Sequence, residues 1–321
     1  MHAACMGDGA PATTPGRQGR APNAAGTVER CIPVQTCRNA FDEDAMDYKT
    51  ILVHIDAAPG AQARAAFAAR LALAHGAHVT GLAQTGISRF LYESTAPGAD
   101  FGALAPLFEQ LRADAETRTR QFDAAMRQAG VASFEHRIDD EEPAAALAFH
   151  ALYADLAIVG GDPDDMRLPG YVALNAPCPL LMLPQAAASL PASADPAFGR
   201  VLVAWNASPQ AARAVRFALP LLARARDVEV AIFTHDEDAG SDALEGVDIG
   251  AYLARHGVAA DIRRQRAPAD AGTALLALAG ERQCDLLVMG CYGHSRFREI
   301  LLGGASRTVL GHANLPVLLA H

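Results

Sequence analysis

The chain has 321 residues, enough for two ordinary domains with separate hydrophobic cores. Its 51% hydrophobic and 20% charged residues fit a soluble globular protein, and no stretch reaches the ~18 uninterrupted apolar residues of a membrane span. A formal net charge of −9 argues against general binding to nucleic acid or to anionic membranes, because both are polyanions. The six cysteines show neither a C-x-x-C pair nor a Cys/His metal spacing, which predicts reduced thiols and a cytoplasmic protein.

Residues 1–47 carry many Gly, Ala, Pro, Thr and Arg residues without helical or strand periodicity. Such a composition cannot bury enough apolar surface to fold, so we expect this segment to be a disordered extension. It contains no continuous apolar region of the kind found in a secretory signal. Order is expected to begin near Tyr48.

Residues 48–185 alternate strand patterns with helix patterns, and we interpret them as a first domain. Gly76 is a C-cap candidate for the first helix, and Pro143 suits the start of a later one. The predicted strands are 50–56, 78–83, 132–138, 156–159 and 180–183, and the predicted helices are 61–75, 104–128 and 143–153. This alternation implies right-handed βαβ crossovers and a parallel sheet covered on both faces, which is an α/β fold.

Residues 186–198, rich in Ala, Ser and Pro, form the predicted linker, after which the pattern begins again in residues 199–321. The sequence VLVAWNASP (201–209) aligns with ILVHIDAAP (51–59), and DLLVMG (285–290) aligns with DLAIVG (155–160). The predicted strands of this second unit are 201–205, 228–234, 260–265, 285–289 and 317–319, and the predicted helices are 210–225, 244–256, 271–282 and 305–312. Two copies of one domain are therefore present.

A glycine-rich loop follows the fourth strand of the second copy. Gly290, Gly293, Gly303 and Gly304 lie between that strand and a helix. Glycines permit a positive φ and let main-chain N–H groups approach an anion, and a helix start adds unpaired N–H donors and a positive dipole end. The arrangement predicts a phosphate cradle. It has the spacing of neither a P-loop nor a dinucleotide-binding turn, and a tight turn that needs glycine only for packing is the alternative.

The spacing Gly290, two residues, Gly293, nine residues, Gly303 resembles the nucleotide-binding signature of the universal stress protein (UspA-like) family. The resemblance extends from Tyr48 to the end of the chain. It implies two tandem Rossmann-like domains of the adenine nucleotide α-hydrolase-like type, each a five-stranded, mainly parallel sheet with helices on both faces. It also implies an intramolecular pseudo-dimer in which the fifth strands, 180–183 and 317–319, meet across the interface. A homodimer of the whole chain is compatible with it.

The resemblance further implies that the second copy binds an adenine nucleotide, ATP, with Mg²⁺ supplied by the nucleotide. Contacts to the base and sugar are expected from Asn206, Ala207, Ser208, Thr234 and Met289. Contacts to the phosphates are expected from Gly290, Gly293, His294, Arg296, Gly303, Gly304, Ala305 and Ser306. Two positions depart from the family pattern: Gly304 stands where a Ser or Thr is usual, and Asn206 stands where Asp is frequent. No catalytic residue and no protein metal ligand is predicted.

The first copy differs where this chemistry would lie. Its loop after the fourth strand is shorter and lacks the spaced glycine, and it carries Asp162, Asp164 and Asp165 where phosphates would bind. Like charges repel, so we expect the first copy to have lost ATP binding and to serve as a structural partner. A metal site at these three carboxylates is the weaker alternative to a solvated loop.

These features favour a cytosolic stress protein that binds ATP as a regulatory or signalling ligand, with slow or no hydrolysis. Gly304 and Asn206 keep open the alternative of a stress or partner-interaction protein whose nucleotide site has degenerated. An ATP-using enzyme of the related adenine-binding fold is less favoured, because no S-G-G-x-D motif follows the first strand.

Overall fold

The computed structural model describes residues 27–30, 47–88, 101–163, 165–184, 198–234, 242–266, 269–292 and 304–321. The elements of the first half are β2 (Thr50–Ile55), α1 (Ala61–His75), β3 (His78–Gln84), α3 (Phe101–Ala129), β4 (Phe134–Asp139), α4 (Pro143–His150), the 3₁₀ turn η2 (Ala151–Tyr153), β5 (Leu156–Gly160), α5 (Arg167–Asn175) and β6 (Leu180–Leu183). The elements of the second half are β7 (Arg200–Trp205), α6 (Pro209–Leu222), β8 (Asp227–Thr234), α7 (Asp242–Arg255), β9 (Ala260–Arg266), α8 (Ala271–Glu281), β10 (Leu286–Gly290), α9 (Gly304–His312) and β11 (Val317–Ala320). A further strand, β1 (Thr27–Arg30), precedes both.

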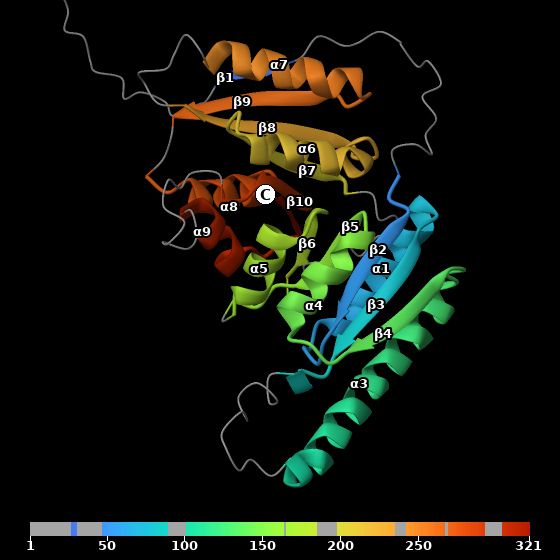
Figure 1. The fold of residues 1–321 in the computed structure, drawn as a ribbon. Coiled ribbons are helices and arrows are strands. Elements are labelled where there is room, and N and C mark those ends of the chain that lie inside the picture. Colours follow the sequence, from blue (N-terminus) through green and yellow to red (C-terminus); the bar gives the residue numbers. More distant parts are fainter. Residues whose placement is uncertain are drawn as a thin grey trace, which may run out of the picture.

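The described strands form one sheet of 11 strands in the order β1-β9-β8-β7-β10-β11-β6-β5-β2-β3-β4, which runs through the whole molecule (Figure 1). Each half contributes five parallel strands, because every neighbouring pair within a half is parallel. The predicted α/β class, with a mainly parallel five-stranded sheet in each half, is confirmed.

The two halves join through their fifth strands. β11 pairs with β6 in antiparallel register, with Val317 opposite Met182 and Leu319 opposite Leu180. All residues of these two strands are buried. Unpaired apolar strand edges invite aggregation, and mutual pairing removes both edges at once. The predicted meeting of the fifth strands is thereby confirmed.

Helices cover both faces of the sheet (Figure 1). On one face α1, α3, α6 and α7 bury a core that is continuous across the two halves. On the other face α4, α5, α8 and α9 bury a second core. Contacts on the first face also tie the halves together: the rings of Phe67 and Phe198 lie 5.9 Å apart, and the Tyr48 hydroxyl donates to the carbonyl of Phe217 at 2.7 Å.

Most predicted elements are present, and the differences have local causes. The predicted helix 143–153 ends at His150, and its last three residues form a 3₁₀ turn. Sequence analysis did not predict α5, because Pro169 and Gly170 are poor helix formers; burial of Val172 and Ala173 compensates. It also did not predict β1, which lies inside the segment expected to be disordered and pairs antiparallel with β9. Among the described helices, none combines the length and apolar character needed to cross a membrane.

Candidate functional site

The order of the strands places the candidate site at the carboxyl ends of β7 and β10. These neighbours are parallel, with Leu286 opposite Val201 and Met289 opposite Ala204. β7 continues outward to β8, whereas β10 continues in the opposite direction to β11. This is the topological switch point of the second half, where open parallel sheets bind ligands. The loops after β7 and β10, which hold most of the predicted site residues, therefore begin side by side.

The turn after β7 is an ordered polar turn that starts α6. The Oδ1 atom of Asn206 accepts hydrogen bonds from the Ser208 hydroxyl at 2.7 Å and from its N–H at 3.3 Å. The Ser208 hydroxyl oxygen in turn accepts from the N–H of Ala211 at 3.1 Å, so Ser208 is the N-cap of α6. Ala207 has a φ of 52°, and Asn206 and Ala207 are exposed. The turn thus presents Asn206 to solvent, while its Oδ1 atom is already hydrogen-bonded to Ser208.

Gly290 ends β10 directly against the first turn of α6. An added Cβ would overlap the N–H nitrogen of Ala211 and would lie 2.5 Å from the carbonyl carbon of Gln210, closer than real Cβ contacts come. Close packing therefore explains this glycine without a ligand. Its proximity also brings the positive end of α6 to the end of β10.

The structure describes only part of the predicted phosphate loop. Gly293, His294, Arg296 and Gly303 lie outside the described residues. Gly304 begins α9 and is exposed; within the described part of the chain, no heavy atom lies within 4 Å of an added Cβ. The first turn of α9 carries no acidic residue. With respect to the described residues the start of α9 is exposed, and the first N–H groups of a helix have no partner within the helix itself.

Ser306 has a different environment from the one expected. Its side chain is buried, with 4% exposed, and its hydroxyl oxygen accepts from the N–H of Tyr292 at 3.2 Å. Tyr292 has a φ of 60°, so this hydrogen bond holds a left-handed residue at the start of the loop. The Tyr292 hydroxyl lies 2.9 Å from where a Cβ would be on Gly170, in α5 of the first half. Ser306 and Tyr292 thus connect the loop, α9 and the other half.

Three further predicted positions lie in β10, at the end of β8 and in the first turn of α9. Met289 is buried, with 4% exposed, in the core under α8 and α9, so its side chain packs as a core residue. Thr234 is the last residue of β8, and Ala305 is half-buried in the first turn of α9. Cys291 is fully buried, and burial raises the pKa of its thiol to about 12, which makes it an inert core residue at neutral pH.

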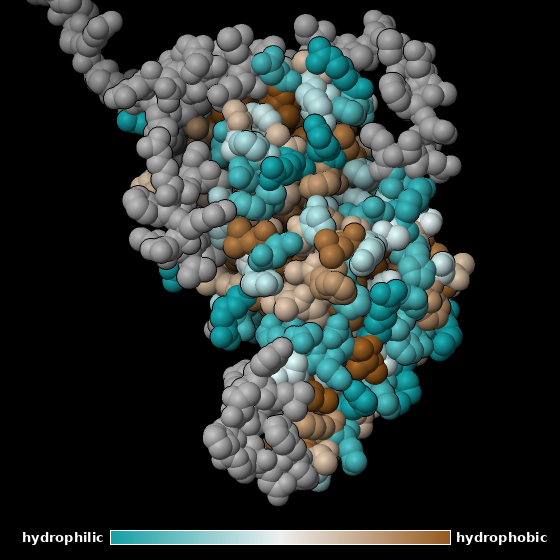
Figure 2. Space-filling model, in the orientation of Figure 1, coloured by the Kyte–Doolittle hydropathy of each residue, from teal (hydrophilic) through white to brown (hydrophobic). Residues whose placement is uncertain are grey.

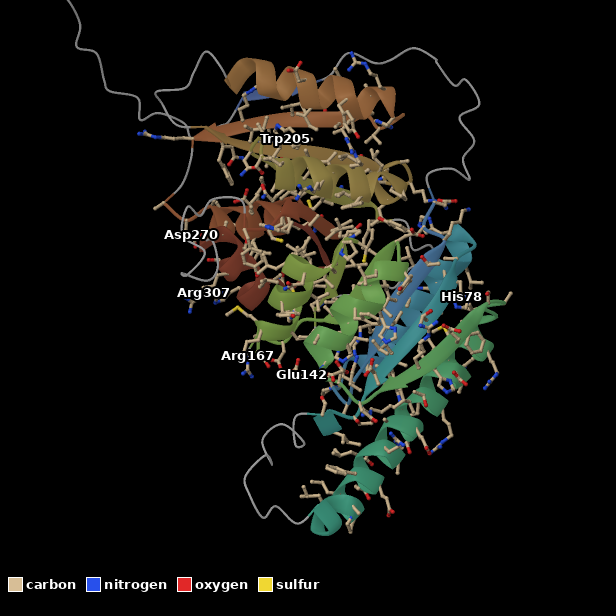
Figure 3. The ribbon with its side chains drawn as sticks, in the orientation of Figure 1. His78, Glu142, Arg167, Trp205, Asp270 and Arg307 are labelled. Carbon is tan, nitrogen blue, oxygen red and sulfur yellow. The ribbon has the colours of Figure 1, made fainter. Side chains whose placement is uncertain are left out.

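Asp270 lies at the edge of the candidate site and was not predicted from the sequence. It is the N-cap of α8 and accepts from the Thr273 hydroxyl at 2.6 Å and from the Gly272 N–H at 3.0 Å. It also accepts from the Thr308 hydroxyl of α9 at 3.3 Å, and these hydrogen bonds, Thr273 first, lower the pKa of the carboxyl. Figure 3 shows Asp270 near Arg307, at the side where α8 and α9 begin. The sequence could have indicated this role, because an Asp directly before a predicted helix is a typical N-cap.

The equivalent place in the first half is filled by a buried arginine. The Arg64 side chain, 3% exposed, donates through Nη2 to Asp56 at 2.6 Å and through Nε to the carbonyl of His54 at 3.0 Å. A Cβ on Gly160, the counterpart of Gly290, would overlap the Arg64 guanidinium. In the aligned second copy, position 214 is alanine.

The charges of this cluster depend on one another. Burial lowers the pKa of His54 to about 4, so the imidazole is neutral at pH 7. Burial by itself would raise the pKa of Asp56, but the Arg64 charge and hydrogen bond outweigh it and the net shift is downward. The first half therefore keeps an internal anion-cation pair where the second half has Asn206 and Ala214.

The acidic loop of the first half forms no metal centre in the described residues. Asp165 accepts from the Nε of Arg167 at 2.9 Å and from its N–H at 3.0 Å, which ties this carboxylate to the start of α5. Asp164 lies outside the described residues. Among the residues that are described, no group of three or more His, Cys, Asp or Glu side chains could hold a metal ion.

Comparisons with known proteins agree with this architecture. Residues 197–321 match the model of the Universal stress protein family, so the second half of the chain is a universal stress protein domain. The fold resembles that of a universal stress protein from Archaeoglobus fulgidus, with a TM-score of 0.67 at 15% identity over 86% of this chain and 97% of that chain. A functionally unknown protein from Pseudomonas aeruginosa gives a TM-score of 0.56 at 18% identity over 86% of this chain and 94% of that one.

At these identities the similarity concerns the fold alone. Because each similarity covers 86% of this chain, it includes the first half as well as the second. The tandem arrangement is therefore consistent with both structures. The comparison with curated protein sequences gave no match.

Proposed function

We propose that the second half binds ATP, together with its Mg²⁺, as a regulatory or signalling ligand, with slow or no hydrolysis. One observation carries the proposal: the two copies differ at the same place in the same fold. The first half places the buried Arg64 guanidinium there, whereas the second half has the smaller Ala214 and, at the start of α9, an exposed Gly304. A switch point without the buried Arg64–Asp56 pair, together with a helix start that is exposed among the described residues, suits a phosphorylated ligand.

Local electrostatics support the phosphate end of this proposal. The start of α9 offers main-chain N–H groups and the positive end of its dipole, and its first turn carries no carboxylate; the Asp270 carboxylate nearby accepts from Thr308, one turn further on. His294 and Arg296, which lie outside the described residues, would add donors if the family pattern holds in this loop. In this proposal the phosphates bind over Gly304 and Ala305.

The turn after β7 supports the sugar and base end. Because the Oδ1 atom of Asn206 accepts from Ser208, the Asn206 amide group is fixed in orientation and offers its N–H donors to a ligand oxygen or ring nitrogen. Ser208 is used as the N-cap, so its part is to hold the turn. Asn206 is therefore the residue that we propose contacts the ribose or adenine.

The free thiols in the described part of the chain, Cys178, Cys284 and Cys291, support the proposed cytoplasmic location. The proposal assigns no general base, so turnover is expected well below the roughly 1 per second of a typical slow enzyme.

The chain contains one tryptophan, Trp205, and it directly precedes Asn206. The test is therefore a titration of the full chain with MgATP, followed by Trp205 fluorescence and by calorimetry. We expect saturable binding of one ATP per chain and at least about 10-fold weaker binding in the Gly293→Val and Gly303→Asp variants.

Gln128→Asp adds the same carboxylate to an exposed position of α3 in the other half and is the charge-matched control. It should leave binding unchanged. Absence of saturable binding to the wild type would refute the proposal, and equal binding by the glycine variants would place the site elsewhere. Turnover near 1 per second or faster would favour the ATP-using enzyme.

A second candidate function is a partner-interaction protein without nucleotide. The buried Ser306 hydroxyl, used by Tyr292, and the missing hydroxyl at Gly304 favour it, because two expected phosphate contacts are then absent. The same titration decides between the two functions.

A further inference from the structure

α5 of the first half packs against α9 and against the start of the connection after β10, although both belong to the second half (Figure 1). A Cβ added to Gly170 of α5 would lie 2.9 Å from the Tyr292 hydroxyl oxygen and 4.0 Å from Cδ1 of Leu310 in α9. A Cβ added to Gly311 of α9 would lie 3.0 Å from the sulfur of Met166, the N-cap of α5. In the space-filling view, apolar residues gather in the middle of the visible face, where Figure 1 places α5 (Figure 2). α5 and α9 therefore pack against each other across the junction of the two halves.

Tyr292 connects this contact to the start of α9. Its N–H donates to the hydroxyl of Ser306, in the first turn of α9, at 3.2 Å. Its ring lies edge-on to the ring of His321, with the centroids 6.3 Å apart. His321 in turn donates through Nδ1 to the carbonyl of Cys291 at 3.1 Å. Because close-packed interiors transmit strain, a displacement of Tyr292 would be passed on to Ser306 and so to the start of α9.

Packing, and not a hydrogen bond, holds the Tyr292 hydroxyl. The hydroxyl is buried, and no group among the described residues is hydrogen-bonded to it. Gly170 leaves room for it, since a Cβ only 2.9 Å away would be closer than real Cβ contacts come. Gly170 has no positive φ that would require glycine, and glycine within a helix is unfavourable. We therefore attribute the glycine at this position to the close approach of Tyr292.

The aligned position of the first half is occupied differently. The alignment of DLLVMG with DLAIVG places Asp162 where the second half has Tyr292, and Asp162 is exposed, whereas Tyr292 is half-buried. The residues just before them have the same backbone pairing, because the N–H groups of Gly161 and Cys291 each donate to the fifth strand of their own half. Within the described part of the chain, a tyrosine at this position thus reaches across the junction only from the half with the proposed nucleotide site.

We propose that α5 of the first half sets the nucleotide affinity of the second half. In this proposal Gly170 fixes the position of Tyr292, and Tyr292 fixes the start of α9 through Ser306. These three are positioning residues, and none of them needs to contact the nucleotide. A binding site keeps its geometry to within about 0.5 Å only when supporting residues hold it, and α5 supplies that support here. The inference rests on the proposed function, in which the phosphates bind at the start of α9.

The test is a double-mutant cycle on the full chain, with the Kd for MgATP measured by calorimetry. Gly170→Ala places a methyl group against the Tyr292 hydroxyl and should raise the Kd about 10-fold. Tyr292→Phe removes the hydroxyl oxygen and makes room for that methyl group. In the Tyr292→Phe background, Gly170→Ala should therefore raise the Kd less than about 2-fold. Such a rescue is not expected from a general loss of stability.

Gly280→Ala is the matched control, because Gly280 is an exposed residue of α8 and no described atom lies within 4 Å of an added Cβ. It should leave the Kd unchanged. Circular dichroism checks that each variant is folded. Tyr292→Ala tests the contact without crowding it, in case Gly170→Ala does not fold. It removes the ring that α5 supports and should also raise the Kd at least about 10-fold.

The outcomes separate this proposal from the proposed function. A wild type that binds MgATP with a Kd that neither Gly170→Ala nor Tyr292→Ala changes would overturn this proposal and leave the proposed function standing. An equal effect of Gly170→Ala in both backgrounds, or an equal effect of Gly280→Ala, would also overturn it. A wild type without saturable binding would overturn the proposed function and this inference together.

Discussion

Gly304→Ser tests most directly whether the second half is a nucleotide site. This substitution returns the hydroxyl that the family pattern has at this position. The structure offers room for it: Gly304 is exposed, its φ is not positive, and in the described residues no heavy atom lies within 4 Å of an added Cβ. The new hydroxyl would stand at the open start of α9, beside the main-chain donors assigned to the phosphates.

The expected gain follows from the strength of a hydrogen bond to a charged group, about 1.5–3 kcal/mol when it is well formed. At an exposed helix start the lower end applies, and about 1.4 kcal/mol corresponds to a tenfold change in Kd. We therefore expect Gly304→Ser to bind MgATP about 10-fold more tightly than Gly304→Ala. Alanine is the matched control, because it removes the same backbone freedom without adding a hydroxyl.

Calorimetry and Trp205 fluorescence measure both variants and the wild type. Equal affinities for the serine and alanine variants would refute the placement of the phosphates over α9. Binding by the serine variant alone would show that the scaffold is intact and that the natural site has degenerated.

Three further predictions concern packing and pH. Gly290→Ala should lower the free energy of unfolding by about 3 kcal/mol in urea titrations, because its Cβ meets the backbone of α6; a loss below about 1 kcal/mol would show that α6 can move away. Arg64→Ala should cost about 2–3 kcal/mol by leaving Asp56 partly buried without its cation, and an unchanged unfolding midpoint would contradict this. Burial lowers the pKa of His54 to about 4 in the folded chain, whereas it is near 6.5 in the unfolded chain. Between pH 4 and 6.5 the unfolded chain therefore binds more protons than the folded chain. Stability should therefore fall as the pH drops from 6.5 to 4, and less steeply in His54→Gln; identical slopes would exclude His54 as a source.

The fold was predictable because local signals and burial agree. The apolar run at residues 180–183 predicted a strand with those bounds, and the family resemblance implied its partner at residues 317–319, which an exposed apolar edge also favours. The helix at residues 61–75 was likewise predicted with its bounds, since Gly76, with a φ of 60°, ends it. α5 was missed because Pro169 and Gly170 oppose a helix locally, and only packing against the sheet compensates for them.

The candidate site was less predictable because position in the sequence does not show how a side chain is used. Ser208 was assigned to the ligand, although a Ser before Pro209 is also a typical helix N-cap, which is what the structure shows. Ser306 was assigned to a phosphate, and its hydroxyl instead binds the N–H of Tyr292. Arg64 received no role, although the alignment with Ala214 was available; only three-dimensional packing shows that its guanidinium covers Gly160.

The two copies share one fold but differ in the residues at the switch point. This difference has a physical reason. A polar pocket left without a ligand must be hydrated or filled, because buried polar groups without partners are costly. The first half places the Arg64–Asp56 pair there and has a short connection from Gly160 to Arg167. The second half has a connection twice as long, from Gly290 to Gly304, and no described residue covers Gly304 at the start of α9. Tyr292, at the start of this connection, lies against Gly170 of α5, so the connection begins at the junction with the other half.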